Sequence, residues 1–214
     1  MTAYTLIDNE AVSIIVPVSN LIYAGNVYIN YMQQDLAKKE LILVHNNPSD
    51  DFDQWVFLSG LYPMARIYQL DHGTSLGECL NYCADRTIFE NIAVFHEMHH
   101  YGHEYLSGAL NEMYLNSADI AGKKTYFAQC ENESRQTLIN PGFEKCFTDT
   151  VILPTFIFKQ ALFKDIRFKD SNENLDTQFC EECRENRKHI YSTGAGGFQF
   201  CCPAGMDIGT NVGK

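Results

Sequence analysis

The run "AVSIIVPVSN", residues 11–20, decides the fold class of this chain, because its apolar residues are continuous rather than alternating. Continuous apolar strands are typical of parallel sheets that helices cover on both faces. The runs "ELILVHNN" (40–47) and "NIAVFHE" (91–97) have the same character. We therefore predict an α/β fold with a mostly parallel sheet flanked by helices, in which ligands bind at the carboxyl ends of the strands.

The segments between these runs predict the rest of the architecture. Helix-like patterns cover 24–36, 52–61 and 75–87, and a short strand is expected over 65–71. In the second half, strands and a helix are expected within 119–130 and 150–163, and "DTQFCEECRENR" (176–187) predicts a helix capped by Asp176. A last strand is expected near "GFQF" (197–200). This organisation predicts a single domain over residues 1–200, followed by a glycine-rich tail over 201–214.

The charge balance restricts the possible partners. Of 214 residues, 16 are Lys or Arg and 27 are Asp or Glu, which gives a formal net charge of −11. Nucleic acid is not an expected partner, because phosphate-backbone binding requires clustered cations. There is no apolar run long enough for a membrane span, and "MTAYTLIDNE" (1–10) lacks the features of a secretion signal. We therefore expect a cytoplasmic protein.

Eight cysteines require a choice between thiols, disulfides and zinc. Cys79 and Cys83 are spaced i, i+4 on an apolar helix face, which favours buried thiols. Cys180 and Cys183 have C-x-x-C spacing, but the adjacent cysteines at 201–202 are a poor second pair for a structural zinc ion. Zinc and a surface disulfide stay open there as alternatives.

The stretch "FHEMHHYG" (95–102) is the strongest candidate for chemistry. His96, Glu97 and His100 match H-E-x-x-H, in which a helix presents two zinc ligands and a general base. The preceding residues are strand formers, whereas a zinc hydrolase needs a long helix at this point. A zinc hydrolase is one alternative, and solvated polar residues after a strand are another.

Several segments resemble glycosyltransferase family 2, whose members are nucleotide-sugar enzymes with the GT-A fold, a Rossmann-like sheet. "VSIIVPVSN" resembles its V-S-I-I-x-P-x-Y-N opening, and "ELILVHNNPSDD" is similar to its E-I-I-V-V-D-D-G-S-T-D-D stretch. "NIAVFHEMHHYGHEYL" is similar to Y-I-A-K-F-D-D-D-D-Y-Y-G-P-N-Y-L of a bacterial branch, some of whose proteins are associated with spore-surface maturation. "FKDIRFKDSNENLDTQFCEECRENRKHIYST" resembles its V-R-F-P-D…G-E-D-T-D-F…C-R-E-N-G-Y-K-I-Y-A-T ending. The resemblance covers residues 11 to about 200.

The resemblance implies a set of nucleotide-binding residues. They are Pro17, Val18, Ser19, Asn20, His45, Asn46, Leu76 and Glu97. His45 or Asn46 stands where the family has the Asp that pairs with uracil. An Asn side chain at that position still offers one acceptor and two donor hydrogens.

The resemblance also implies a metal site with altered ligands. The family's acidic quartet, which holds Mn2+ or Mg2+ against the diphosphate, corresponds to His96, Glu97, Met98 and His99. Along a strand Glu97 and His99 would point to the same side, which makes them the favoured ligand pair, with His96 as a further candidate. Imidazole ligands suit Mn2+ better than Mg2+.

The family's catalytic base corresponds to Asp176, which would take the proton from the acceptor hydroxyl; the competing interpretation is a plain helix cap. The resemblance thus implies an inverting glycosyltransferase that uses a UDP-sugar donor and an unknown glycan, protein or small-molecule acceptor. The alternative, which the loss of acidic residues favours, is a catalytically impaired relative that serves in binding or assembly at the spore surface.

Overall fold

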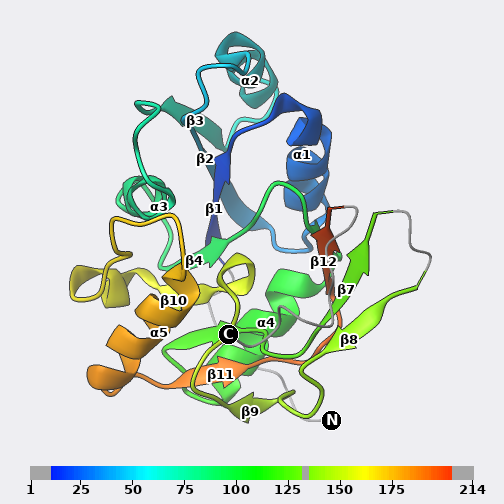
Figure 1. Ribbon diagram of the computed structural model, residues 1–214, viewed down its shortest axis with the longest axis vertical. Coiled ribbons are helices and arrows are strands. Elements are labelled where there is room, and N and C mark those ends of the chain that lie inside the picture. The colour runs from blue at the N-terminus through cyan, green and yellow to red at the C-terminus, as the bar shows by residue number, and fades with distance from the viewer. Residues whose placement is uncertain (1–10, 132–134, 204–214) are drawn as a thin grey trace.

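A computed structural model describes residues 11–131 and 135–203 of the chain. Residues 1–10 and most of the expected glycine-rich tail lie outside these residues. The first half alternates strands and helices (Figure 1): β1 (Ala11–Val18), α1 (Ala24–Gln33), β2 (Lys38–His45), α2 (Phe52–Ser59), β3 (Ala65–Gln69), α3 (Leu76–Ala84) and β4 (Asn91–Val94). β1 pairs in parallel with β2 and with β4, and β2 pairs in parallel with β3, as the apolar runs predict.

The second half completes this sheet and adds a smaller one. The large sheet has the order β3-β2-β1-β4-β10-β6-β11-β9 and gains β6 (Ile120–Gly122), β9 (Cys146–Phe147), β10 (Ile157–Lys159) and β11 (Ile190–Ser192). The small sheet has the order β5-β12-β7-β8 and consists of β5 (His100–Tyr101), β7 (Tyr126–Cys130), β8 (Thr137–Ile139) and β12 (Phe198–Cys202). The remaining helices are α4 (Tyr105–Leu115), α5 (Leu175–Glu185) and the 3-10 turns η1 (Leu21–Tyr23), η2 (Leu153–Thr155) and η3 (Gln160–Lys164).

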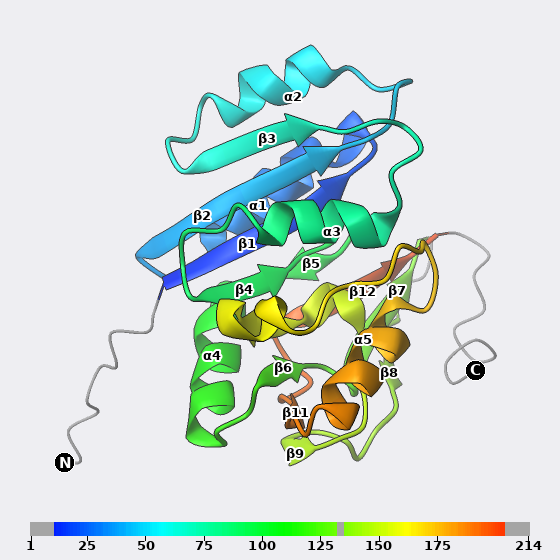
Figure 2. The ribbon, with the colours of Figure 1, turned by 90° about the vertical axis from the view of Figure 1, so that its left-hand side faces the viewer.

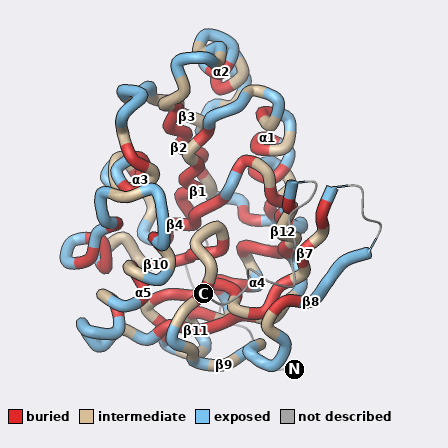
Figure 3. The backbone as a smooth tube through the Cα atoms, viewed as in Figure 1, coloured by how far each residue is buried: buried red, intermediate tan, exposed pale blue. Residues whose placement is uncertain are grey.

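Helices cover both faces of the large sheet, and most residues of the strands at its centre are buried (Figures 2 and 3). Alternate residues of β1 face opposite sides: Ile14 packs with α1, α4 and the small sheet, whereas Ile15 packs with α3 and α5. This explains why "IIV" (14–16) is apolar without alternation. The thiols of Cys79 and Cys83 are buried in the α3 side of the core, as predicted.

Two local predictions differ from the structure. The strand expected over 91–97 ends at Val94, and the chain turns at His96–His99, where the His99 amide donates to the His96 carbonyl at 3.3 Å. The His96 amide, which a longer strand would use in its ladder, donates instead to the Tyr101 hydroxyl at 2.8 Å. Within 150–163, the helical and strand structure expected there takes the form of the 3-10 helices η2 and η3 on either side of β10.

The start of α5 and the end of the last strand also differ from the prediction. The residue that caps α5 is Asn174, in the left-handed region at φ 57°, so Asp176 lies in the first turn and is not the cap. β12 continues to Cys202, past residue 200 where the tail was expected to begin. Within the described residues, no helix has the length and apolarity needed to cross a bilayer.

Candidate functional site

A cavity of about 240 Å³ opens at the carboxyl edge of β1, β2 and β4. Its walls are mainly apolar, and their polar groups come from the loops that follow these strands. The lining residues are Pro17, Val18, Ser19, Asn46, Leu76, Cys79, Leu80, Val94, Phe95, His96, Glu97, Leu153, Pro154 and Asn172. This set contains no Lys or Arg, among the residues that the structure describes.

Seven of the residues singled out in the sequence meet at this cavity. They are Pro17, Val18, Ser19, Asn46, Leu76, His96 and Glu97. Their convergence follows from the parallel register, in which Val18 pairs with His45 and Ile15 pairs with Val94, so the three strands end at one edge. The loops after β1, β2 and β4 therefore face a common space.

Glu97 connects the loop after β4 to the loop after β1. Its Oε1 accepts a hydrogen bond from the Ser19 hydroxyl at 2.7 Å, and its Oε2 accepts from the amides of Ser19 at 2.9 Å and Asn20 at 3.3 Å. Burial raises the pKa of the Glu97 carboxyl, and the hydrogen bonds from Ser19 and Asn20 offset that rise only in part. The carboxylate thus fixes the position of a loop that forms one wall of the cavity.

Asn46 is the residue after β2 that faces the cavity. Its amide nitrogen donates to the Thr74 carbonyl at 2.9 Å and approaches the Cys79 sulfur at 3.5 Å, which fixes the orientation of the side chain. With the nitrogen engaged in this way, the Oδ1 atom is the group that a ligand donor can use.

His45 and Asn20 lie outside the cavity wall. His45 is fully buried, with its Nε2 atom 3.3 Å from Asp50 Oδ2 and its ring against Phe52. The Asn20 side chain accepts from the Ile22 amide at 3.0 Å and caps η1. Of the two residues that follow the second apolar run, Asn46 therefore faces the cavity and His45 does not.

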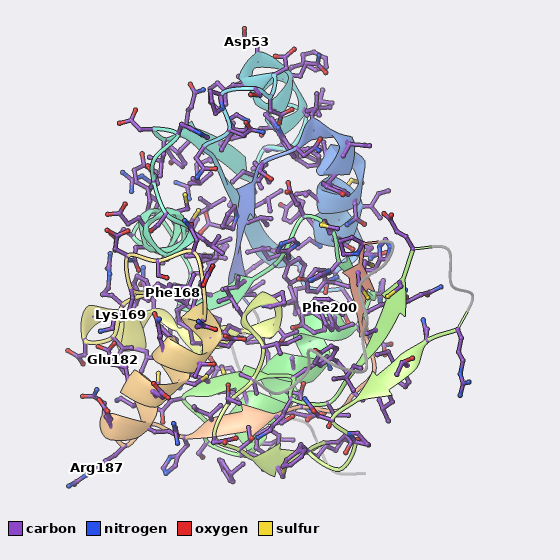
Figure 4. The ribbon with its side chains drawn as sticks, in the orientation of Figure 1. Asp53, Phe168, Lys169, Glu182, Arg187 and Phe200 are labelled. Carbon is purple, nitrogen blue, oxygen red and sulfur yellow. The ribbon has the colours of Figure 1, made fainter. Side chains whose placement is uncertain are left out.

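Asn172 lines the cavity, although no sequence motif singles it out. It belongs to the segment 168–172 before α5, which packs on α3, and its Oδ1 accepts from the Leu76 amide at 2.8 Å. The segment 168–172 lies so close to α3 that a Cβ atom at Gly77 would be 1.8 Å from the Lys169 carbonyl oxygen. Figure 4 shows Phe168 and Lys169 beside α5, where Lys169 forms an ion pair with Glu182 at 2.8 Å.

Asp176 is not one of the residues that line the cavity. It is half-buried in the first turn of α5, and its Oδ1 accepts from the Thr177 amide at 2.8 Å. Burial raises the pKa of Tyr126 to about 12, and the charge of Asp176 adds to that rise, so the carboxylate lies within electrostatic range of the small sheet. A role for Asp176 as a base stays a prediction.

The favoured metal-ligand pair, Glu97 with His99, does not share one side of a strand, because there is no strand at this point. His99 is buried, with its ring 4.2 Å from the Phe200 ring, and its Nδ1 accepts from the Cys201 amide at 3.2 Å. His96 Nδ1 accepts from the Met98 amide at 3.2 Å. The Nδ1 atoms of both rings and both Glu97 oxygens therefore already accept hydrogen bonds from the protein, and this arrangement does not fit a divalent ion.

The zinc hydrolase alternative fails on geometry. H-E-x-x-H requires a helix, whereas His96 and Glu97 lie in a turn and His100 begins β5. Across residues 11–131 and 135–203, no group of three or more His, Cys, Asp or Glu side chains is arranged to hold a metal ion, and this includes the cysteines at 180, 183, 201 and 202.

Neither a protein-family profile nor a curated protein sequence matches this chain. Its fold is similar to that of S. aureus TarS, with a TM-score of 0.70 and 20% identity over 90% of this chain and 37% of that one. For TarS 1-349 in complex with UDP-GlcNAc, the TM-score is 0.71 at 20% identity, over 92% of this chain and 60% of that one. TarS 1-349 in complex with UDP gives 0.70 at 20% identity, over 90% and 60%.

The chain therefore spans between 37% and 60% of the length of these neighbours. Identity at this level establishes the fold alone. The predicted fold class, an α/β domain with a mostly parallel sheet in a GT-A-like arrangement, is confirmed.

Proposed function

We propose that this chain binds a nucleotide-diphosphate sugar, in the first instance a UDP-sugar, and transfers the sugar to an acceptor with inversion. The observation that supports this most directly is the convergence of the loops after β1, β2 and β4 on one partly apolar cavity. Neighbours with the same fold have been solved with UDP-GlcNAc and with UDP. The acceptor is a glycan, a protein or a small molecule.

In this proposal the cavity takes the base and ribose. Apolar side chains such as Leu76 and Val18 would pack against the faces of the base, and the Asn46 Oδ1 atom would accept a hydrogen bond from its edge. The diphosphate and sugar would extend toward the open side of the cavity. A cation-free wall fits the uncharged nucleoside better than it fits the phosphates.

Ligand binding can be tested by thermal or urea unfolding with UDP. A ligand that binds only the native state stabilises it by about 2.7 kcal/mol at a hundred times its dissociation constant. The Asn46→Ala variant should lose most of this stabilisation, because it removes the proposed base acceptor. The matched variant Asn186→Ala, whose side chain bonds only the Glu182 carbonyl at the end of α5, should keep it. Equal stabilisation of both variants would contradict the role of Asn46.

Catalysis can be tested separately through donor hydrolysis. In the proposal, Asp176 accepts the proton of the attacking hydroxyl, so Asp176→Asn should reduce turnover by about a hundredfold or more while UDP still binds. Asp53→Asn is the control, because Asp53 is exposed on α2 at the far end of the molecule (Figure 4). Unchanged turnover in Asp176→Asn would show that Asp176 is not the catalytic base.

A second candidate function is nucleotide-sugar binding without catalysis. It is favoured by the position of Asp176 outside the cavity wall and by the replacement of the family's acidic quartet. UDP binding by the unmodified chain with no turnover of any UDP-sugar would support it.

A further inference from the structure

The turn at His96–His99 is held in place by contacts from three directions. From α1, the Asn26 amide nitrogen donates to the carbonyls of Glu97 at 2.7 Å and His99 at 2.9 Å, and Asn30 donates to the His99 carbonyl at 2.8 Å. From β12, the Cys201 amide donates to the His99 ring. The backbone carbonyls and one imidazole are therefore committed to structural contacts.

The Glu97 side chain is committed in the same way, to the loop after β1. Two backbone amides and one hydroxyl of this loop converge on its two oxygens. A carboxylate is the acceptor that satisfies three such donors at once, and hydrogen bonds to a charged acceptor are stronger than neutral ones. These donors occupy three of the roughly four lone-pair sites of the carboxylate, so a metal ion could use only the remaining site on Oε1 without displacing one of them.

The imidazoles of His96 and His99 lack a free lone pair. A neutral imidazole has one nitrogen that accepts and one that carries hydrogen, and in both rings Nδ1 accepts from a backbone amide. The hydrogen is then on Nε2, which cannot bind a metal in that form. The two rings also stack on each other, with their centroids 4.6 Å apart.

We propose that Glu97 acts as a brace that holds the Ser19–Asn20 loop against the cavity, and that this chain binds its nucleotide without a divalent metal ion. The identity of the ligand in this inference rests on the proposed function. The bracing role of Glu97 does not, because its hydrogen bonds to Ser19 and Asn20 lie within the protein.

Metal dependence is tested by calorimetric titration of the full chain with UDP, once with EDTA and once with Mn2+. The dissociation constants should agree within about twofold. A titration of Mn2+ without nucleotide, followed by the EPR signal of free Mn2+, should show no saturable binding. UDP binding that occurs only with Mn2+, or stoichiometric Mn2+ binding, would overturn the proposal.

The brace is tested by Glu97→Gln and Glu97→Asp. In Glu97→Gln, the side-chain amide group faces backbone donors that need an acceptor, and in Glu97→Asp the side chain is one methylene too short to reach the loop. Both variants should weaken UDP binding by about tenfold, to the same extent with EDTA and with Mn2+. If Glu97 were instead a metal ligand, Glu97→Asp should still bind UDP well. Any weakening of UDP binding should then appear only when Mn2+ is present. Glu104→Gln is the control, because Glu104 is exposed and lies outside the cavity.

Failure of the inference can be told apart from failure of the proposed function. If UDP binds in neither buffer, the proposed function fails, and the brace is judged by urea unfolding without ligand. Glu97→Gln and Glu97→Asp should then unfold at lower urea than the unmodified chain and Glu104→Gln. Unchanged midpoints in both Glu97 variants would overturn the brace.

Discussion

At the scale of single residues, buried polar side chains of this protein have partners that lie far away in the sequence. Asn30 on α1 is 2% exposed, donates to the His99 carbonyl and accepts from the Tyr101 amide at 3.1 Å. Lys123 is also 2% exposed, and its amine bonds the Thr193 hydroxyl and the Gly194 carbonyl. Such residues are sensitive points, because removing one partner leaves the other buried without a hydrogen bond.

Asn30→Ala should lower the free energy of unfolding by about 2–4 kcal/mol, because the Tyr101 amide loses its acceptor and the His99 carbonyl loses one of its donors. Urea unfolding measures the change. Asn186→Ala removes one exposed side-chain bond of the same kind and should change the free energy by less than about 1 kcal/mol. If the free energy of unfolding falls by similar amounts in Asn30→Ala and Asn186→Ala, burial does not determine the size of the change.

Lys123 should give the protein a pH-dependent stability at alkaline pH. Burial lowers the pKa of its amine from 10.5 to about 8, and the nearby Glu112 carboxylate only partly opposes that shift. Below pH 8 the amine is charged in both the folded and the unfolded chain, and its burial opposes folding. Between pH 8 and 10.5 the folded protein binds fewer protons than the unfolded chain, so stability rises with pH.

The measurement compares the unmodified chain with Lys123→Met by urea unfolding at about pH 7.5 and about pH 10. Across this window the unmodified chain should gain stability relative to the variant, by an amount on the order of 3 kcal/mol for the full titration. A difference that stays constant with pH would show that the amine is not titrating in the folded state.

At the scale of secondary structure, the contact between α3 and the segment before α5 builds the wall that carries Asn172. The Gly77 amide donates to the Ser171 carbonyl at 3.0 Å, and Asn81 exchanges two hydrogen bonds with the backbone of Phe168. The helix and the segment can approach this closely because Gly77 has no side chain.

Gly77→Ala should destabilise the protein by about 3 kcal/mol, since backbone atoms have to move to admit the methyl group. It should also weaken UDP binding, because Leu76 and Asn172 move apart. Gly108→Ala in α4 is the control: no atom lies within 4 Å of its added Cβ, and Ala is favoured over Gly in a helix by roughly 0.5–1 kcal/mol. Destabilisation by Gly108→Ala as large as that by Gly77→Ala would contradict the steric explanation.

At the scale of the whole molecule, the formal charge of −11 makes the folded state repel itself. Salt screens this repulsion, but it also weakens exposed ion pairs such as Arg167–Asp85. Exposed pairs contribute only about 0–1 kcal/mol each, so relief of the repulsion should dominate.

The urea midpoint should therefore rise when NaCl is increased from about 0.02 M to about 0.5 M, where the Debye length falls from roughly 20 Å to roughly 4 Å. The Arg167→Gln variant, which adds one unit of net negative charge and removes an exposed ion pair, should gain more from salt than the unmodified chain. A midpoint that falls with salt would mean that ion pairs outweigh net repulsion in this protein.

The sequence determined the first half of the fold and its binding edge, because the signals there are local. Continuous apolar strands required cover on both faces, and side-chain caps such as Asp51 and Ser75 fixed where helices begin. Parallel strands that end at one edge are sufficient to predict that Ser19, Asn46 and Glu97 lie near one another.

Tertiary structure alone decided what these residues do at that edge. Glu97 bonds a loop 78 positions away, His99 bonds a strand 102 positions away, and Asn172 reaches the cavity across 96 positions. No periodicity or spacing encodes such partners, because they depend on how the loops pack after the sheet has formed. The sequence of residues 96–99 therefore predicts a strand that carries metal ligands. In the structure these residues form a turn, which hydrogen bonds to α1, β12 and the loop after β1 hold in place.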